Sequence, residues 1–99
     1  MDLKEAEQLA EEHLEPIKLY LRIFNTSDDD DLMRMLKGSF LRIQQLIHSP
    51  DPPNDPVYLE LVYNRVRYDY NEDLEFFEEN FQAEILAQSL LNSVGESDE

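Results

Sequence analysis

Cysteine and tryptophan are absent from the sequence, and only two of its 99 residues are glycine. Without cysteine the chain has neither a disulfide framework nor thiol chemistry, which fits a reducing compartment. No apolar run approaches membrane-spanning length, and the N-terminus lacks the apolar core of a signal peptide. The sequence therefore predicts a soluble protein that is not processed at its N-terminus.

Positive charge is scarce as well, with 8 Lys and Arg residues against 23 Asp and Glu residues and a formal net charge of −15. Binding to the phosphate backbone of nucleic acids requires clustered Lys and Arg, so ordinary DNA or RNA binding is disfavoured. An acidic surface can instead keep a protein soluble, bind a basic protein, mimic DNA, or avoid adhering to DNA. The composition alone leaves these four uses open.

Motifs for catalysis, cofactors and metals are missing too: there is no GxGxxG, Walker loop, HExxH or Cys/His metal spacing. The acidic run Asn25–Asp31 lacks the glycine and the glutamate that an EF-hand loop needs, so we interpret it as the start of a helix. His13 and His48 each lie near an expected helix end, where a surface role is the default. We therefore expect no enzyme activity, no catalytic residue, no cofactor and no metal.

Apolar residues at helical spacing are what the chain does contain. They predict an all-α fold, a small bundle of about four helices with a Pro-rich connecting loop. The N-terminal segment before Pro16 is expected to be either a helix docked at the edge of the bundle or a frayed arm. Pro16 is expected to begin a new helix, and Gly95 is expected to stop the last one. The expected helices cover 2–12, Pro16–Phe24, Asp29–His48, 57–70 and 74–94. As domains, we expect an N-terminal helical extension over 1–14, a helical domain over 15–94 and an acidic disordered tail over 95–99.

The stretch Asp55–Phe81 is the richest in aromatic residues and is expected to be the packing hub. The helix over 57–70 has apolar residues on more than one side, which is typical of a helix that is central or covered by a partner. Along the final helix the apolar stripe changes direction, so we expect its first half to serve the core and its second half a neighbouring protein. The residues expected at this interface are Phe81, Ile85, Leu86, Leu90, Leu91 and Val94.

Four prolines fall within the eight residues Ser49–Pro56, which predicts an extended, semi-rigid loop without helix. Two interpretations stay open. The loop is a plain connector, or it docks on a partner or faces a channel. The residues concerned are Pro50, Asp51, Pro52, Pro53 and Asn54.

Three segments in a fixed order carry a family resemblance. LEPIKLYLRIF, which contains Ile17–Ile23, is followed by an Asp-rich start and a long helix, DDDDLMRMLKGSFLRIQQLI, which contains Asp30–Ile47. After the Pro-rich loop, DPVYLELVYNRVRYDYNEDLEFFEENFQAEI contains an aromatic corner over Tyr68–Phe81. From Glu15 to Leu91 this order resembles the small head–tail connector proteins of tailed bacteriophages, the head-completion adaptors. The acidic N-terminal helix, Met1–Glu12, has no counterpart in that pattern.

The resemblance implies an α-helical structural protein of the virion that forms a ring, commonly dodecameric, beneath the portal protein. Its C-terminal segment would dock on the portal, and its Pro-rich loop would face the channel or the next ring. Double-stranded DNA would pass through the channel without sequence-specific binding, and a stopper or tail-completion protein would bind below. Such a protein is located at the head–tail interface of the virion, and in the host cytoplasm during assembly.

Two other functions stay open. The first is an acidic DNA mimic or inhibitor that blocks a basic nucleic-acid site on an enzyme. The second is a small immunity or antitoxin protein, a class that is also acidic and helical. A connector assembles on a portal, whereas a mimic acts as a monomer or dimer and competes with DNA. A portal or capsid gene within a few reading frames would favour the connector.

Overall fold

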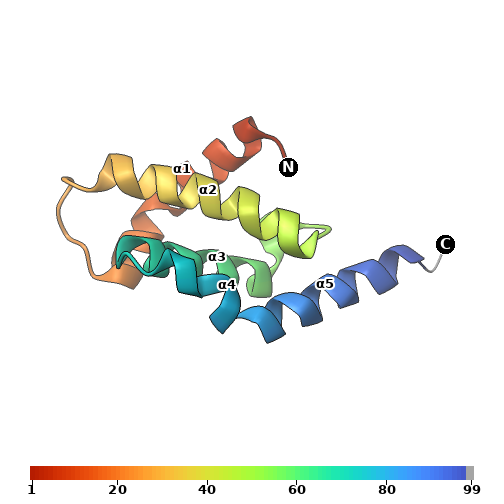
Figure 1. The fold of residues 1–99 in the computed structure, drawn as a ribbon. Coiled ribbons are helices and arrows are strands. Elements are labelled where there is room, and N and C mark those ends of the chain that lie inside the picture. The colour runs from red at the N-terminus through yellow and green to blue at the C-terminus, as the bar shows by residue number, and fades with distance from the viewer. Residues whose placement is uncertain (98–99) are drawn as a thin grey trace.

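The computed structural model describes residues 1–97, and every regular element in that range is helical. The predicted all-α fold is therefore confirmed. Three helices form the body of the molecule, and the last helix runs outward from one end of it (Figure 1). The elements are α1 (Leu3–Leu21), α2 (Asp29–Ile47), the 3₁₀ turn η1 (Pro52–Asn54), α3 (Pro56–Tyr70), the 3₁₀ turn η2 (Leu74–Phe76), α4 (Phe77–Asn80) and α5 (Gln82–Ser97).

The core lies among α1, α2 and α3, and α4 closes it. Apolar side chains on α2 that step by four and three residues are all fully buried, as their spacing predicts. The hydroxyl of Tyr58, a fully buried residue of α3, donates a hydrogen bond of 2.5 Å to the carbonyl of Phe40 on α2. This bond satisfies a polar group that would otherwise be costly to bury. The buried apolar residues are Ala6, Leu9, Ala10, Ile17, Ile23, Leu32, Leu36, Phe40, Ile43, Ile47, Tyr58, Leu61, Val62, Val66 and Phe77.

The helix boundary predicted at Pro16 is wrong, because α1 continues through Pro16 without a break. Proline lacks an N–H, so the bond to the carbonyl of Glu12 is missing. Glu12 is exposed, so water can reach that carbonyl. Buried residues on both sides of the proline, Ala10 and Ile17, pack into the same core. This shared packing outweighs the lost bond and keeps the helix in one piece.

Three turns of the chain use the left-handed backbone conformation without glycine. Arg22, His48 and Glu72 have φ values of 61°, 51° and 61°, and neither glycine has a positive φ. At Arg22 the next residue donates from Ile23 N to Lys18 O at 2.8 Å, which closes the end of α1 as a Schellman motif. The sequence has only two glycines, and neither lies at these turns. The residues that do lie there adopt a backbone conformation that is strained for a residue with a Cβ atom.

The Pro-rich loop is not wholly extended, and the prediction that it contains no helix is wrong at η1. A 3₁₀ turn needs only bonds between residues three apart. The N–H groups of Asn54 and Asp55 supply them, at 3.1 and 3.3 Å, so the missing N–H groups of the prolines are not required. Asp55 then caps α3, because its side chain accepts from Val57 N and Tyr58 N, both at 3.1 Å. This cap, with Pro56 in the first turn of α3, is the predicted one.

The single final helix that the sequence predicts is divided into η2, α4 and α5, with Phe81 between the last two. The rings of Phe77 and Phe81 stack 4.8 Å apart, and both meet the ring of Tyr68 edge-on at 5.7 Å. These contacts hold α4 against α3. The stop predicted at Gly95 is also wrong, since α5 runs to Ser97. The remainder of the predicted tail, 98–99, lies outside the described residues.

Candidate functional site

Helix α5 has two faces of different character. The face toward the body carries half-buried polar residues, and the amide of Asn92 donates to the carbonyl of Ile47 at the end of α2. The outward face carries a stripe of exposed Ala and Leu side chains, with the exposed polar residues Gln82, Glu84 and Ser93 beside it. Facing the body are Phe81, at the start of the helix, and Ile85, Gln88, Ser89 and Asn92; facing outward are Ala83, Leu86, Ala87, Leu90 and Leu91.

The outer face of α5, defined by those five residues, is unusual for this protein. Leu86, Leu90 and Leu91 are 57%, 57% and 64% exposed. No charged residue occurs from Ile85 to Ser93, although 31% of the whole chain is charged. An exposed apolar surface of this kind is a candidate site for contact with another protein. This surface is the main candidate functional site.

The residues predicted to form this interface divide into two groups. Phe81 and Ile85 are partly buried against the core, so they anchor α5 to the body. Leu86, Leu90 and Leu91 are exposed and available to a partner. The side chain of Val94 lies outside the described residues. The change in direction of the apolar stripe reflects this division, and contact with a partner stays a prediction.

The predicted loop Pro50–Asn54 lies at the end of α2, near the part of α5 that contacts Ile47 (Figure 1). Its two ends are fixed. The hydroxyl of Ser49 donates to Asp55 at 2.7 Å, and the amide of Asn54 donates to Asp51 at 3.1 Å. The tip between them is mostly exposed. The loop is thus a firm projection at the same end of the molecule as α5, and its role as a docking loop stays a prediction.

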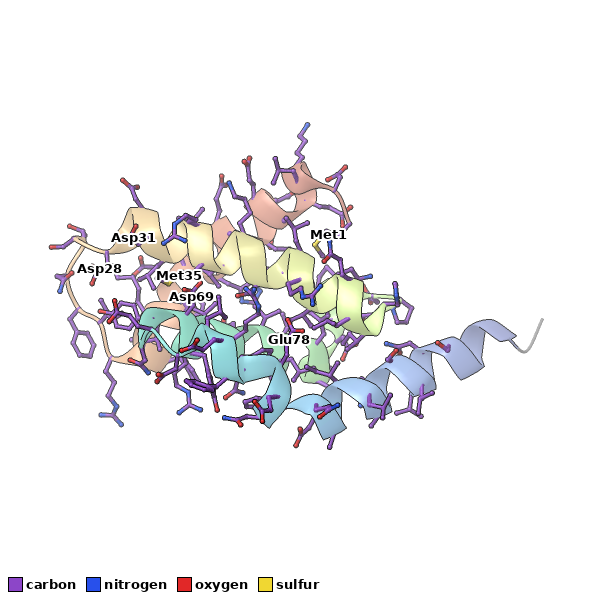
Figure 2. The ribbon with its side chains drawn as sticks, in the orientation of Figure 1. Met1, Asp28, Asp31, Met35, Asp69 and Glu78 are labelled. Carbon is purple, nitrogen blue, oxygen red and sulfur yellow. The ribbon has the colours of Figure 1, made fainter. Side chains whose placement is uncertain are left out.

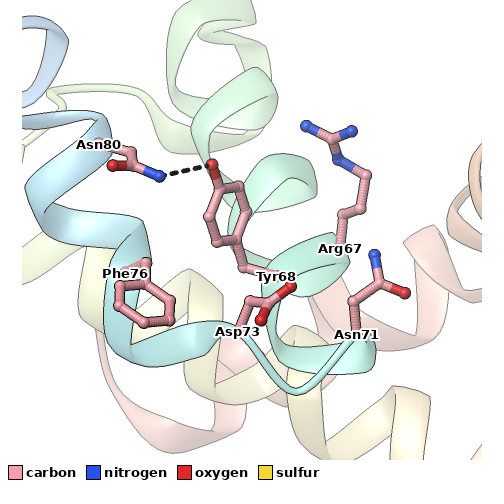
Figure 3. A pocket seen from close by; sticks show the side chains of 6 residues that line it. All are labelled: Arg67, Tyr68, Asn71, Asp73, Phe76 and Asn80. Atoms are coloured by element: carbon pink, nitrogen blue, oxygen red, sulfur yellow. Dashed lines mark hydrogen bonds between the residues drawn. The ribbon is translucent and has the colours of Figure 1, made fainter.

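A polar pocket of about 380 Å³ lies where α3 ends and η2 begins (Figure 3). Its polar groups largely bond to their neighbours: Asn80 donates to the hydroxyl of Tyr68 at 3.1 Å, and Arg67 donates to Asn64 at 3.1 Å. The lining holds one basic and one acidic side chain but no pair of nucleophile and base. The residues are Arg67, Tyr68, Asn71, Asp73, Phe76 and Asn80.

An apolar groove of about 410 Å³ lies between α1 and α3. The prediction of a surface role near a helix end is wrong for His13, which lies in the middle of α1 and is half-buried. Its Nδ1 is 2.7 Å from the hydroxyl of Tyr63 on α3. Burial lowers the pKa of His13 below its ordinary value, so its neutral form is favoured. The residues that line the groove are His13, Tyr20, Pro56, Leu59, Glu60, Tyr63 and Asn64.

Ion pairs join the elements at several points. Arg42 on α2 donates two hydrogen bonds of 2.8 and 2.9 Å to Glu78 on α4. Figure 2 shows where Glu78 lies. These bonds lower the pKa of Glu78. Both side chains are more than two-fifths exposed, at 41% and 44%, so solvent screening limits this pair to about 1 kcal/mol or less. Lys18 on α1 pairs with Asp29 on α2 at 2.9 Å. These pairs position helices and do not form a reactive centre.

Within residues 1–97, no cluster of three or more His, Asp or Glu side chains is suited to a metal ion. The same residues include no helix that is both long and apolar enough to cross a membrane. Comparison of the chain with protein-family models, with curated proteins and with solved structures finds no match. Function must therefore be inferred from the surfaces described above.

Proposed function

We propose that this protein is a structural adaptor of the head–tail connector in a tailed bacteriophage. In this role α5 docks on the portal protein through its outer face. Further copies complete a ring, commonly dodecameric in such connectors. The observation that carries the proposal is that α5 projects from the body and, from Ile85 to Ser93, has no charge and exposes three leucines. A monomer gains nothing from such a surface, whereas an assembled subunit buries it.

The acidic surface supports the same role. A channel wall with excess carboxylates repels the DNA backbone, so double-stranded DNA passes through without being held. The Pro-rich loop, firmly held at both ends, is the part we assign to the channel or to the next ring, where the stopper or tail-completion protein binds. The protein would act at the head–tail interface of the virion after assembly in the host cytoplasm. It would need no cofactor, and we assign it no enzyme activity.

The proposal is tested by binding to the portal protein encoded nearest to this chain. Replacing Leu86 and Leu90 with Asp places two charges on the outer face of α5. Burial of each leucine is worth about 1.5–3 kcal/mol, so binding should weaken by about 100-fold or more. Binding is measured by sedimentation, and electron microscopy of the mixture shows whether a ring forms on the portal.

The matched control is the double variant Gln8→Asp/Thr26→Asp, which adds the same charge at exposed polar positions outside α5. It should bind as the unaltered protein does. Equal binding by the Leu86/Leu90 variant would remove α5 from the interface. If no portal binding occurs at all, the connector role itself fails.

The net charge of −15 favours one second candidate, an acidic inhibitor that occupies a basic nucleic-acid site on an enzyme. This class also includes DNA mimics and immunity proteins. Such a protein would displace DNA from the enzyme as a monomer or dimer and would ignore the portal. Competition against DNA in the same sedimentation assay separates the two functions.

A further inference from the structure

The groove between α1 and α3 has aromatic walls and little charge. The ring of Tyr63 meets the rings of Tyr20 and His13 edge-on, with centroids 5.5 and 5.7 Å apart. Because His13 and the Tyr63 hydroxyl bond to each other, they present few free polar groups to a ligand. Glu60 is the one charged side chain among the lining residues. Such a groove is suited to an aromatic side chain that brings a positive charge with it.

An exposed aromatic side chain of this kind follows α1. The Schellman motif at Arg22 turns the chain back, so Ile23 is 8% exposed and packs into the core. The next residue, Phe24, is left outside and is 81% exposed, more than any other large apolar side chain among the described residues. An apolar cavity of about 150 Å³ holds a benzene ring, so the groove is large enough for that of Phe24.

The charges beside Phe24 and beside the α1–α3 groove are complementary. Arg22 lies two residues before Phe24, and Glu60 lines the groove. Neither takes part in an ion pair within residues 1–97. Two copies that each carry a net charge of −15 repel one another, so they can meet only where acidic groups are few or balanced. The groove has Glu60 as its one charged lining residue. Arg22 is basic, but Asp28–Asp31 follow Phe24 closely, so the contact relies on the Arg22–Glu60 pair and on screening by salt to offset repulsion from these aspartates.

We propose that Phe24 of one copy inserts into the α1–α3 groove of a second copy, with Arg22 placed beside that copy's Glu60. A second copy fills the groove and buries Phe24 at the same time. A different protein that filled the groove would leave Phe24 exposed. This contact would join neighbouring copies in the ring of the proposed function. The number of copies in the ring rests on that proposed function. It uses surfaces other than the outer face of α5, which is left for the portal.

The test measures self-association of the full chain without portal, by sedimentation equilibrium up to millimolar concentration and at several salt concentrations. The unaltered protein should associate as concentration rises, and more strongly with salt because salt screens the repulsion between copies. Phe24→Ser should weaken association by about tenfold or more. Since Phe24 is exposed, this variant should keep the circular dichroism spectrum of the unaltered protein. Leu3→Ser is the matched control, because it also removes an exposed apolar side chain, at a position outside both proposed interfaces, and it should associate normally.

A charge exchange tests the second half of the contact. Arg22→Glu and Glu60→Arg should each weaken association, and the double variant should restore it. Lys4→Glu changes the net charge as Arg22→Glu does, at a distant exposed position, and should have a smaller effect. The proposal is overturned if the unaltered protein stays monomeric at all concentrations, if Phe24→Ser associates equally well, or if the double variant is no better than the singles.

The α5 variants distinguish this proposal from the proposed function. Leu86→Asp/Leu90→Asp should lose portal binding and keep self-association through Phe24. If self-association fails while the portal is still bound, only the contact between copies is wrong. If self-association through Phe24 is found but the portal is never bound, the connector role fails and the contact stands.

Discussion

At the scale of single residues, the scarcity of glycine has a direct structural cost. Three turns require a positive φ and are occupied by Arg22, His48 and Glu72. A side chain with a Cβ atom is strained in this conformation, whereas glycine adopts it freely. The packing of the helices that these turns connect compensates for the strain. The positions could not be identified from the sequence, because the usual signal for them, a glycine, is absent.

Replacing any one of these three residues with glycine should therefore stabilise the protein. The expected gain in the free energy of unfolding is about 0.5–1 kcal/mol for each, because the strain disappears and the turn is unchanged. Urea unfolding at neutral pH and low protein concentration measures it. Gln8→Gly, in the exposed middle of α1, is the control and should cost about 1 kcal/mol. A loss of stability at all three turns would show that their side chains make contacts worth more than the strain.

The half-buried histidine makes stability depend on pH. Burial lowers the pKa of His13, while the unfolded chain keeps the ordinary value of about 6.5. As pH falls through that value, the unfolded state binds a proton that the folded state does not, so this group destabilises the fold increasingly. His13→Gln should remove this contribution. The measurement is the free energy of unfolding of both proteins at pH 7.5 and pH 5.5.

When the pH is lowered from 7.5 to 5.5, the free energy of unfolding of His13→Gln should fall less, or rise more, than that of the unaltered protein. Comparing the two proteins cancels the titration of the carboxylates, which both share. Gln8→Asn serves as the control, because it changes an exposed residue of the same helix without removing a titrating group, and it should follow the unaltered protein. Identical pH dependence for His13→Gln would mean that His13 protonates equally easily in the folded chain. Its bond to Tyr63 joins residues 50 apart in sequence, so no local pattern could have indicated it.

At the scale of elements, the sequence was sufficient where the signals were local. The long helix α2 and the capped start of α3 follow from apolar spacing and from Asp55 followed by Pro56, and both are found as predicted. Prediction failed where tertiary contacts decide. Pro16 stays inside α1 because both halves of that helix share one core, and the final helix divides where Phe81 stacks on Phe77. The exposed apolar residues of α5 were partly predictable, because the apolar stripe of that helix changes direction. The α1–α3 groove was not, because it forms only when two helices distant in sequence come into contact.

Removal of α5 tests whether the helix belongs to the fold or to an interface. Among the residues whose burial the structure describes, 1–93, every fully buried apolar one lies at or before Phe77, so a chain that ends at Asn80 keeps these core residues. It loses the half-buried side chains of Phe81 and Ile85, which should cost about 1–3 kcal/mol. Urea unfolding should remain cooperative, and portal binding should be abolished. Unchanged portal binding would show that α5 is not the docking element, and an unfolded product would show that α5 is essential to the bundle.

At the scale of the whole molecule, the excess of acidic groups works against the fold. The chain has 23 Asp and Glu side chains and only 8 Lys and Arg side chains. Several of the cations already form ion pairs, such as Arg42 with Glu78 and Lys37 with Glu7, the latter at 3.6 Å. The remaining carboxylates repel one another more in the compact state than in the expanded one. A protein that only had to fold would not need this excess. It is explained by what the surface must repel or attract, which for the proposed connector is the DNA in its channel.

Salt should consequently stabilise this protein, although it weakens each of its ion pairs. At high ionic strength the general repulsion among carboxylates is screened, and we expect a gain of about 1 kcal/mol, or about 4–8 °C in Tm for a domain of this size. Thermal unfolding in low and high sodium chloride measures it, since this salt has little of the burial-promoting effect of sulfate. Glu11→Gln/Glu79→Gln, which removes two exposed charges, should start from a higher Tm in low salt and respond less. A Tm that falls with salt would mean that the few ion pairs between helices outweigh the repulsion of the surface.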